Sequence, residues 1–246
     1  MIKFGTDGWR AVISDEFTFA NVEKVAKAIA LYLINHGFSQ QTLIISYDAR
    51  FLADKFALAV AKVMIEAGID CFITERDTPT PVVAWDVVRN KAAGAVMLTA
   101  SHNPPEYCGI KFIPDYGGPA DETITNELQE NSNKELSLTP APNKGKLEHY
   151  EPRARYLERL QSFVDVELIK KAKLKVVYDP MHGSGRGYTD KLLQALGCQV
   201  EVINGNRDVL FGGRNPEPAD ENLADLKAKM KEIGANVGFA NDGDAD

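Results

Sequence analysis

Short apolar runs alternate with helical patterns of apolar and polar residues along most of the chain. From Phe19 to Asn35 the apolar side chains recur every three or four residues, which predicts an amphipathic helix that Gly37 ends. The apolar run Leu43–Tyr47 then predicts a buried strand. We expect further helices at 53–67 and 81–89 and further strands at 69–73 and 94–98. This alternation is typical of a layered α/β protein.

A polar segment, residues 131–149, separates this pattern from a second one, and we expect it to be a surface connection. Helices over 150–172 lead to the second alternation, with strands at 173–178, 201–204 and 235–240 and helices at 188–196 and 222–233. The sequence therefore predicts two layered α/β domains, 1–150 and 151–246, each with a mixed sheet flanked by helices.

Glycines between a strand and a helix of the second domain have to be compared with a dinucleotide-binding turn. After Gly183 and Gly185, the third glycine of a G-x-G-x-x-G motif would fall at Tyr188, so the motif fails. A tight strand-to-helix turn is sufficient. The neighbouring His182 either holds this turn by a hydrogen bond or touches a substrate.

Composition excludes several classes of protein. The 246 residues are 44% hydrophobic and 26% charged, as in a soluble globular protein. There is no apolar run long enough for a membrane span, and the start Met1–Phe4 lacks the apolar core of a signal peptide, which favours a cytoplasmic protein. Three scattered cysteines indicate free thiols in a reducing compartment. A net charge of -7 disfavours binding to nucleic acid.

The loop that follows the strand at 94–98 presents a serine. Ser101 lies directly after this apolar run, and Pro104 and Pro105 stiffen the backbone beyond it. One interpretation is a serine and asparagine turn that caps its own backbone. The second interpretation is a hydroxyl that takes part in a reaction. The residues at the C-terminal end of the sequence favour this second interpretation.

Three carboxylates stand at alternate positions at that end, in Asp242, Asp244 and Asp246. Side chains so close would repel one another, and a divalent cation relieves that repulsion. An EF-hand calcium loop and an exposed acidic tail are alternatives, but this run follows a predicted strand, whereas an EF-hand loop follows a helix. If Ser101 carried a phosphoryl group, that group would supply a further anionic ligand to the metal.

Cationic residues extend the same hypothesis. Arg10 follows a glycine-rich turn that would hold it for a phosphate, although pairing with Asp7 is the simpler alternative. Lys111 lies on a predicted strand that returns from the serine loop, where it is either an outward-facing charge or a desolvated acid or base. Asp48 and Arg50 fit a helix cap with a surface ion pair at least as well as a site role.

Taken together, these motifs resemble the α-D-phosphohexomutases, the phosphoglucomutase and phosphomannomutase superfamily. The resemblance covers the whole chain and rests on GTDGWR at 5–10, TASHNPPEY at 99–107, GIKF at 109–112, DPMHG at 179–183, GRNPEP at 213–218 and DGDAD at 242–246. It implies that Ser101 is the phosphorylated serine and that Ser101, Asp242, Asp244 and Asp246 hold one Mg²⁺. It further implies that Arg10 contacts phosphate and that Lys111 and His102 serve proton transfer and loop positioning.

The resemblance also implies a reaction, the interconversion of hexose 1-phosphate and hexose 6-phosphate through a bisphosphorylated sugar, with an activator of the glucose 1,6-bisphosphate type. Such enzymes have four domains, and this chain corresponds to the first two. We therefore expect an N-terminal half that needs its C-terminal domains as partners and is inactive alone.

Two other functions remain open. One is a non-catalytic module that binds phosphosugar or metal, and the other is a phosphatase that uses Asp242 as its nucleophile.

Overall fold

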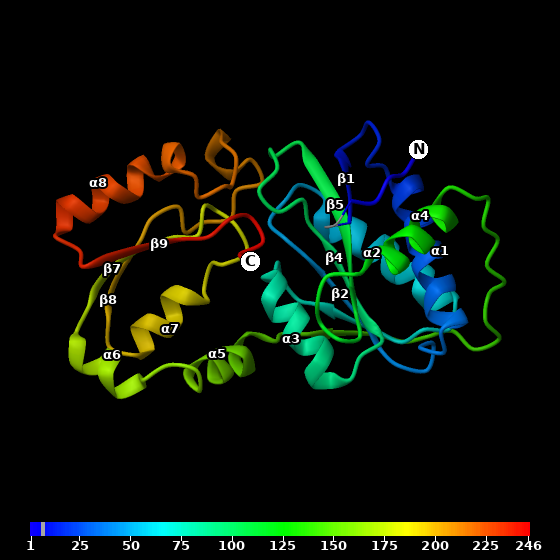
Figure 1. The fold of residues 1–246 in the computed structure, drawn as a ribbon, viewed down its shortest axis with the longest axis horizontal. Helices are drawn as coiled ribbons and strands as arrows, with labels where there is room; N and C mark the ends of the chain where they lie inside the picture. Colours follow the sequence, from blue (N-terminus) through cyan, green and yellow to red (C-terminus); the bar gives the residue numbers. More distant parts are fainter. Residues whose placement is uncertain (6–7) are drawn as a thin grey trace.

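A computed structural model describes residues 1–5 and 8–246 as two α/β units side by side, which confirms the predicted fold class (Figure 1). Thr6 and Asp7, including the predicted pairing of Arg10 with Asp7, lie outside the described residues. In the described part of the chain, no helix has the length and apolar character needed to cross a membrane.

The first unit is built on a six-stranded mixed sheet. Its strands, in spatial order, are β1 (Trp9–Val12), β5 (Tyr107–Pro114), β4 (Gly94–Leu98), β2 (Leu43–Tyr47), β3 (Cys71–Thr74) and β6 (Leu147–Tyr150). Strands β4, β2, β3 and β6 run parallel to one another, while β5 runs antiparallel to both β4 and β1. The chain therefore leaves β4 through the serine loop and returns at once along β5.

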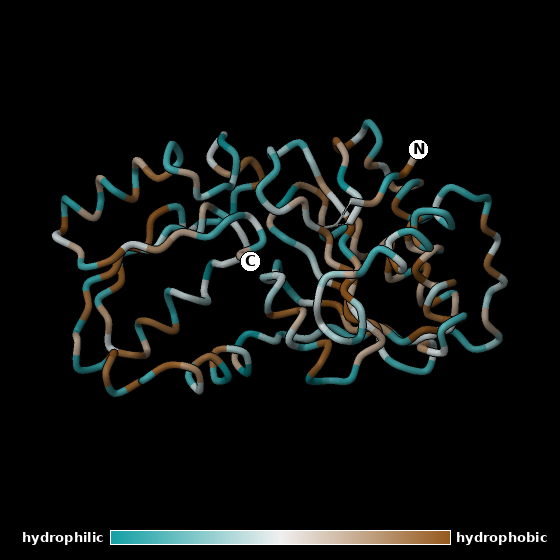
Figure 2. Tube along the Cα trace, in the orientation of Figure 1, coloured by the Kyte–Doolittle hydropathy of each residue, from teal (hydrophilic) through white to brown (hydrophobic). Residues whose placement is uncertain are grey.

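Helices cover both faces of this sheet. Helices α1 (Phe19–Asn35), α2 (Ala53–Glu66) and α4 (Glu122–Ser132) lie on one face, and α3 (Thr80–Asn90) lies on the other. Because side chains alternate along a strand, Leu43 and Ile45 face the larger helical layer and Ile44 faces α3. Figure 2 shows hydrophobic segments concentrated inside this unit.

The second unit has a smaller sheet of three strands, in the order β8 (Gln199–Val202), β7 (Lys175–Asp179) and β9 (Val237–Ala240), which is parallel and not mixed as predicted. Helices α5 (Arg153–Gln161) and α6 (Val166–Ala172) lead into it, α7 (Thr189–Ala195) packs on β8, and α8 (Ala224–Ile233) packs on β7 and β9. Short 3-10 turns occupy Phe211–Gly213 and Asp220–Leu223. Both clusters of packed, buried apolar side chains found in the described residues lie between Ile2 and Leu128, in the first unit.

A further expectation from the sequence needs correction. Residues 131–149 are not only a surface connection, because α4 extends to Ser132 and β6 begins at Leu147 and pairs with β3. Arg10, which follows the glycine-rich segment, lies on β1 and pairs with Gly109 of β5. Hydrogen bonds to the sheet therefore fix the backbone of Arg10.

Candidate active site

Ser101 is held at the carboxyl edge of the first sheet in an uncommon backbone conformation. It follows β4, its φ is 50°, and only 6% of the residue is exposed. Its backbone N–H donates to Thr99 Oγ1 at 2.8 Å, and the N–H of Asn103 donates to the Ala100 carbonyl at 3.0 Å. The predicted stiff turn after β4 is present, and the hydroxyl of Ser101 points away from it toward the second unit.

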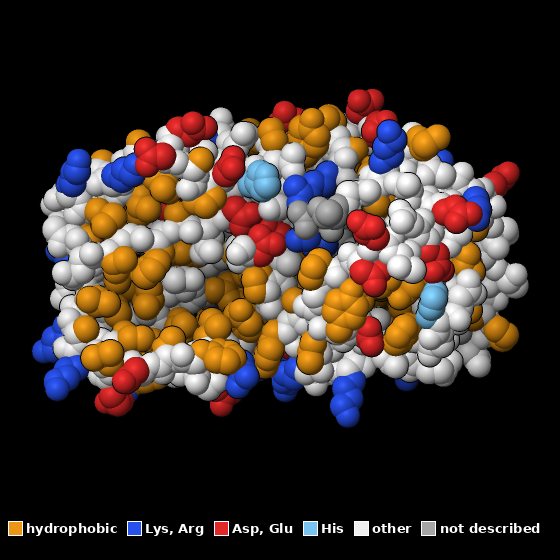
Figure 3. Space-filling model, viewed as in Figure 1, with side chains coloured by type: hydrophobic (Ala, Val, Ile, Leu, Met, Phe, Trp, Pro, Cys, Tyr) orange, Lys and Arg blue, Asp and Glu red, His pale blue; other side chains and the backbone are white. Residues whose placement is uncertain are grey.

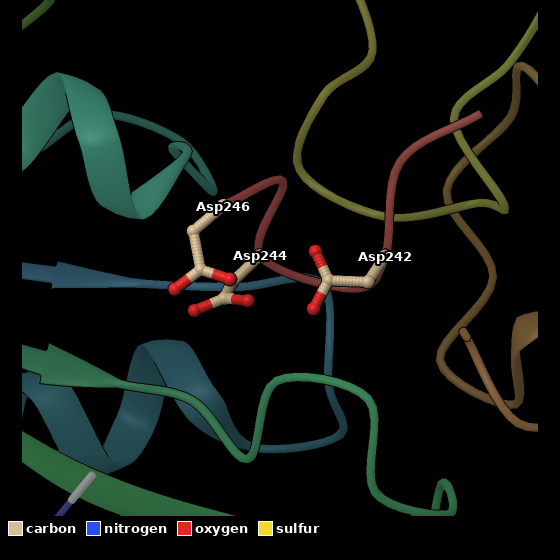
Figure 4. A group of neighbouring side chains, drawn as sticks. All are labelled: Asp242, Asp244 and Asp246. Atoms are coloured by element: carbon tan, nitrogen blue, oxygen red, sulfur yellow. The ribbon is translucent and has the colours of Figure 1, made fainter. Parts of the chain in front are cut away.

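The hydroxyl of Ser101 meets the acidic triad, which we define as Asp242, Asp244 and Asp246. Ser101 Oγ donates to Asp242 Oδ2 at 2.9 Å. Each triad residue offers one oxygen that lies within 4.8 Å of the other two. Figure 4 shows the three carboxylates turned toward a common space. The structure thus brings together the serine and the three aspartates although 141 positions separate Ser101 from Asp242.

Thr80 and the serine loop of the first unit contact the triad segment directly. Thr80, the first residue of α3, donates its hydroxyl to Asp244 Oδ2 at 2.6 Å and its backbone N–H to the Asp244 carbonyl at 2.9 Å. Gly243 lies so close to the serine loop that a Cβ there would come within 2.7 Å of the Ser101 carbonyl oxygen. Only a glycine fits at this point, and it allows the triad to approach the hydroxyl.

The burial of the triad and the repulsion between its carboxylates favour a bound cation. Burial, followed by the charges of Asp244 and Asp246, raises the pKa of Asp242 to about 7. Asp244 is completely buried, and its Oδ1 has no hydrogen-bond partner among the described residues. A buried carboxylate oxygen without a donor is costly unless an ion completes its surroundings. These hard oxygen ligands suit Mg²⁺ or Ca²⁺.

Two cations and a histidine border the same place. Lys111 is 9% exposed on β5, and its Nζ lies 3.2 Å from Asp246 Oδ2, so its ammonium group faces the site and not bulk solvent. Arg10 Nη1 donates to Asn103 Oδ1 at 2.8 Å, beside the serine loop. His102 Nδ1 lies 3.4 Å from Ser101 Oγ. Ser101, the triad, Lys111, Arg10 and His102, all named from the sequence, therefore lie at or beside the serine loop.

An open hollow of about 390 Å³ leads to this point. It is lined by Ser101 and His102 of the first unit and by Glu217, Asp242 and Asp246, among others, of the second. Figure 3 shows acidic side chains gathered where the two units meet. The hollow is large enough for a small phosphorylated molecule to reach the serine and the triad together.

The loop at 179–187 contacts the segment that carries the triad and also pairs with the first unit. These contacts account for the glycine-rich sequence of the loop without a bound nucleotide. Ser184 donates its N–H to the Gly243 carbonyl at 3.0 Å, and Arg186 pairs with Asp77 of the first unit at 2.6 Å. His182 Nδ1 lies 3.1 Å from the Asn206 carbonyl, a contact that ties this loop to the chain after β8.

Sequence reasoning left two contributors to this site undecided and missed a third. Asp48 and Arg50 form a completely buried ion pair at 3.1 Å, so the surface pair considered from the sequence is wrong. Their position just after β2, at the edge where β4 also ends, was the available signal. Thr80 resembles an ordinary residue at a helix start, and only the folded chain brings it to Asp244.

Comparison with known proteins gives matches over nearly the whole chain. Residues 1–139 match the model for phosphoglucomutase/phosphomannomutase, alpha/beta/alpha domain I, and residues 154–246 match the model for domain II. A protein of Methanobrevibacter smithii assigned as a phosphoglucosamine mutase is 36% identical over 99% of this chain and 53% of its own length. The phosphoglucomutase/phosphomannomutase of Thermococcus kodakarensis is 34% identical over 99% of this chain and 53% of its own length.

A solved structure agrees with the sequence matches. A crystal structure from Thermus thermophilus, assigned to the phosphomannomutases, superposes with a TM-score of 0.90 at 33% identity and covers 99% of this chain and 55% of that one. The chain thus spans about half the length of the relatives it matches.

Proposed function

We infer the function of this chain from the fact that it belongs to the phosphoglucomutase/phosphomannomutase family, with domains I and II of that family present. We propose that it forms the part of a phosphohexomutase that carries the phosphoryl group on Ser101 and holds Mg²⁺ at Asp242, Asp244 and Asp246. The substrate is a phosphorylated hexose, interconverted between its 1-phosphate and 6-phosphate.

One observation carries the proposal. Ser101 Oγ, from the first unit, lies 2.9 Å from Asp242, in a triad contributed by the second unit. A nucleophilic oxygen beside three metal-ligating carboxylates matches what phosphoryl transfer needs, namely positioning and charge neutralisation. When bound at the triad, Mg²⁺ would supply electrostatic stabilisation of the phosphoryl oxygens.

Each polar residue around the serine has a distinct role in the proposed transfer. The bond between phosphorus and Ser101 Oγ breaks, and a bond from phosphorus to a sugar hydroxyl oxygen forms. The proton of that hydroxyl leaves toward the imidazole of His102, or toward Lys111 when its amine is neutral, and Ser101 Oγ takes up a proton as its bond to phosphorus breaks. Arg10, anchored beside the loop through Asn103, binds phosphate oxygens.

The second half of the cycle returns the other phosphate of the bisphosphorylated sugar to Ser101. We propose that the C-terminal half of the longer relatives grips the phosphate that is not reacting, because the present chain spans only about half their length. The chain alone then exchanges a phosphoryl group with glucose 1,6-bisphosphate but does not convert glucose 1-phosphate at an appreciable rate.

Intact-mass measurement after incubation with glucose 1,6-bisphosphate and Mg²⁺ tests the proposal. The expected result is a chain heavier by one phosphoryl group, with no gain in Ser101→Ala. Ser184→Ala is a matched control, because Ser184 is buried beside the triad loop but its hydroxyl donates to the Gly243 carbonyl. A phosphoryl group trapped on Asp242 would support the phosphatase alternative, and metal or sugar binding without transfer would support a non-catalytic module.

A further inference from the structure

The guanidinium of Arg50 lies beneath the serine loop, and all of its N–H donors are used. The residue is completely buried, and Nε donates to Asp48 Oδ2 at 3.1 Å. Its four remaining donors bind the backbone carbonyl oxygens of Ser101, Asn103 and Pro104, each at 2.7 Å, and of Tyr107 at 3.0 Å. A guanidinium has five N–H donors, so every donor of Arg50 is bonded either to this loop or to Asp48.

Asp48 holds the loop from the opposite side. Its Oδ1 accepts the backbone N–H of Arg50 at 2.9 Å, and its Oδ2 accepts the hydroxyl of Thr99 at 2.7 Å. Thr99 Oγ1 in turn accepts the backbone N–H of Ser101 at 2.8 Å. The peptide groups on both sides of Ser101 are therefore fixed, the N–H through Thr99 and the carbonyl through Arg50.

This double anchoring coincides with an unfavourable backbone conformation. Ser101 has a φ of 50°, in the left-handed region that residues other than glycine rarely adopt. Such a conformation persists only where the surrounding structure fixes it. It is also the conformation that presents Oγ to Asp242 at 2.9 Å.

Arg50 further connects the loop to the second unit. Its guanidinium carbon lies 5.1 Å from the centre of the Phe211 ring, and Arg207 Nη2 donates to the Arg50 carbonyl at 3.3 Å. Arg50 has no exposed surface and does not line the hollow at the triad. It therefore does not touch a substrate there.

We propose that Arg50, oriented by Asp48, is a positioning residue that holds Ser101 in its left-handed conformation and so sets the place of its hydroxyl opposite the triad. The catalytic consequence rests on the proposed function, whereas the conformational role concerns this chain alone. Lysine cannot replace Arg50, because an ammonium group has three donors on one atom and cannot reach four carbonyls spread around a planar fork.

Hydrogen exchange tests the conformational role. In Arg50→Lys, amides of the segment 99–108 should exchange at least about tenfold faster, because hydrogen bonds to a charged donor are lost there. Amides of α1 should change by less than about twofold. Arg155→Lys is the matched control. Arg155 lies on α5, and its guanidinium pairs with the buried Asp86 at 2.8 Å. The control should leave the segment 99–108 unchanged.

Asp48→Asn provides a second variant if Arg50→Lys does not fold, because it keeps the size of the side chain and weakens its grip on Arg50. In this variant too, amide hydrogen exchange should increase more in the segment 99–108 than in any other part of the first unit. Unchanged exchange in both variants, or an equal increase throughout the first unit, would overturn the proposal.

The rate of phosphoryl uptake from glucose 1,6-bisphosphate tests the catalytic consequence. In Arg50→Lys the maximal rate should fall at least about tenfold while the half-saturating donor concentration stays within about twofold, because Arg50 contacts no substrate. A loosened loop with an unchanged rate would overturn the positioning role. If the wild-type chain takes up no phosphoryl group but Arg50→Lys still loosens the loop, the proposed function fails and the conformational role stands.

Discussion

Replacing Thr80 with valine tests how firmly the first unit holds the acidic triad. Valine keeps the shape of the side chain but removes the hydroxyl that donates to Asp244 Oδ2 at 2.6 Å. Both residues are buried, Thr80 at 7% exposure and Asp244 at 0%, so water cannot easily replace the lost donor. Since Asp244 Oδ1 already has no partner among the described residues, the variant leaves this carboxylate poorly solvated on both oxygens.

A hydrogen bond to a charged group contributes about 1.5–3 kcal/mol. We therefore expect Thr80→Val to lower the free energy of unfolding by about 2 kcal/mol in the absence of divalent cations. For a chain of this size that corresponds to a fall in Tm of about 4–8 °C. Thermal unfolding followed by circular dichroism measures it.

Thr125→Val is the control for this substitution. Thr125 lies in α4, and its hydroxyl donates to the Glu122 carbonyl at 3.3 Å in an exposed setting, so its loss should change the free energy of unfolding by less than about 0.5 kcal/mol. If Thr80→Val is as harmless as the control, the bond from Thr80 to Asp244 does not stabilise the junction, and the reasoning about the buried carboxylate is refuted.

The triad and the sheet beside the serine loop give three further predictions. Asp242→Asn should raise the Tm of the metal-free chain, because it relieves repulsion with Asp244, and should abolish the rise in Tm on adding Mg²⁺; a persisting rise would contradict the metal site. Because the pKa of Asp242 rises from 3.8 to about 7 on folding, the stability of the metal-free chain should fall as pH rises from about 4 to 7, and denaturant titrations of Asp242→Asn should show a smaller fall. Gly109→Ala should destabilise by about 3 kcal/mol, because its Cβ would meet the Thr99 and Trp9 carbonyl oxygens at 2.4 and 2.8 Å; a Tm within about 2 °C of wild type would contradict this.

Local patterns were enough to predict much of the fold. The helix Phe19–Asn35 and the strand Leu43–Tyr47 have the predicted bounds, because one face of the helix and both faces of the strand are buried and leave a clear periodicity. The strand Leu147–Tyr150 has no such pattern, since it lies at the sheet edge with Glu148 and His149 exposed. Its pairing with β3 is a tertiary fact that the local sequence does not encode.

The residues of the candidate site also fall into two groups, those that local sequence motifs reveal and those that only the folded chain brings to the site. The side chains of Ser101 and the triad carry chemistry in recognisable local motifs, so they could be named from the sequence. Arg50 could not be placed, because a charged residue near a turn is usually solvated, and its burial depends on four carbonyls that only the folded loop presents. Thr80 likewise becomes important only where Asp244 meets it.

The uneven distribution of the apolar core has a consequence for the order in which the site forms. Both packed clusters of buried apolar side chains seen in the described residues lie between Ile2 and Leu128, whereas the second unit buries fewer apolar side chains, among them Val176, Val177 and Tyr178. During synthesis the first unit leaves the ribosome first and can condense around its own interior. The nascent chain then displays its serine well before any aspartate of the triad has been translated, so the hydroxyl of Ser101 has no carboxylate partner until synthesis reaches Asp242.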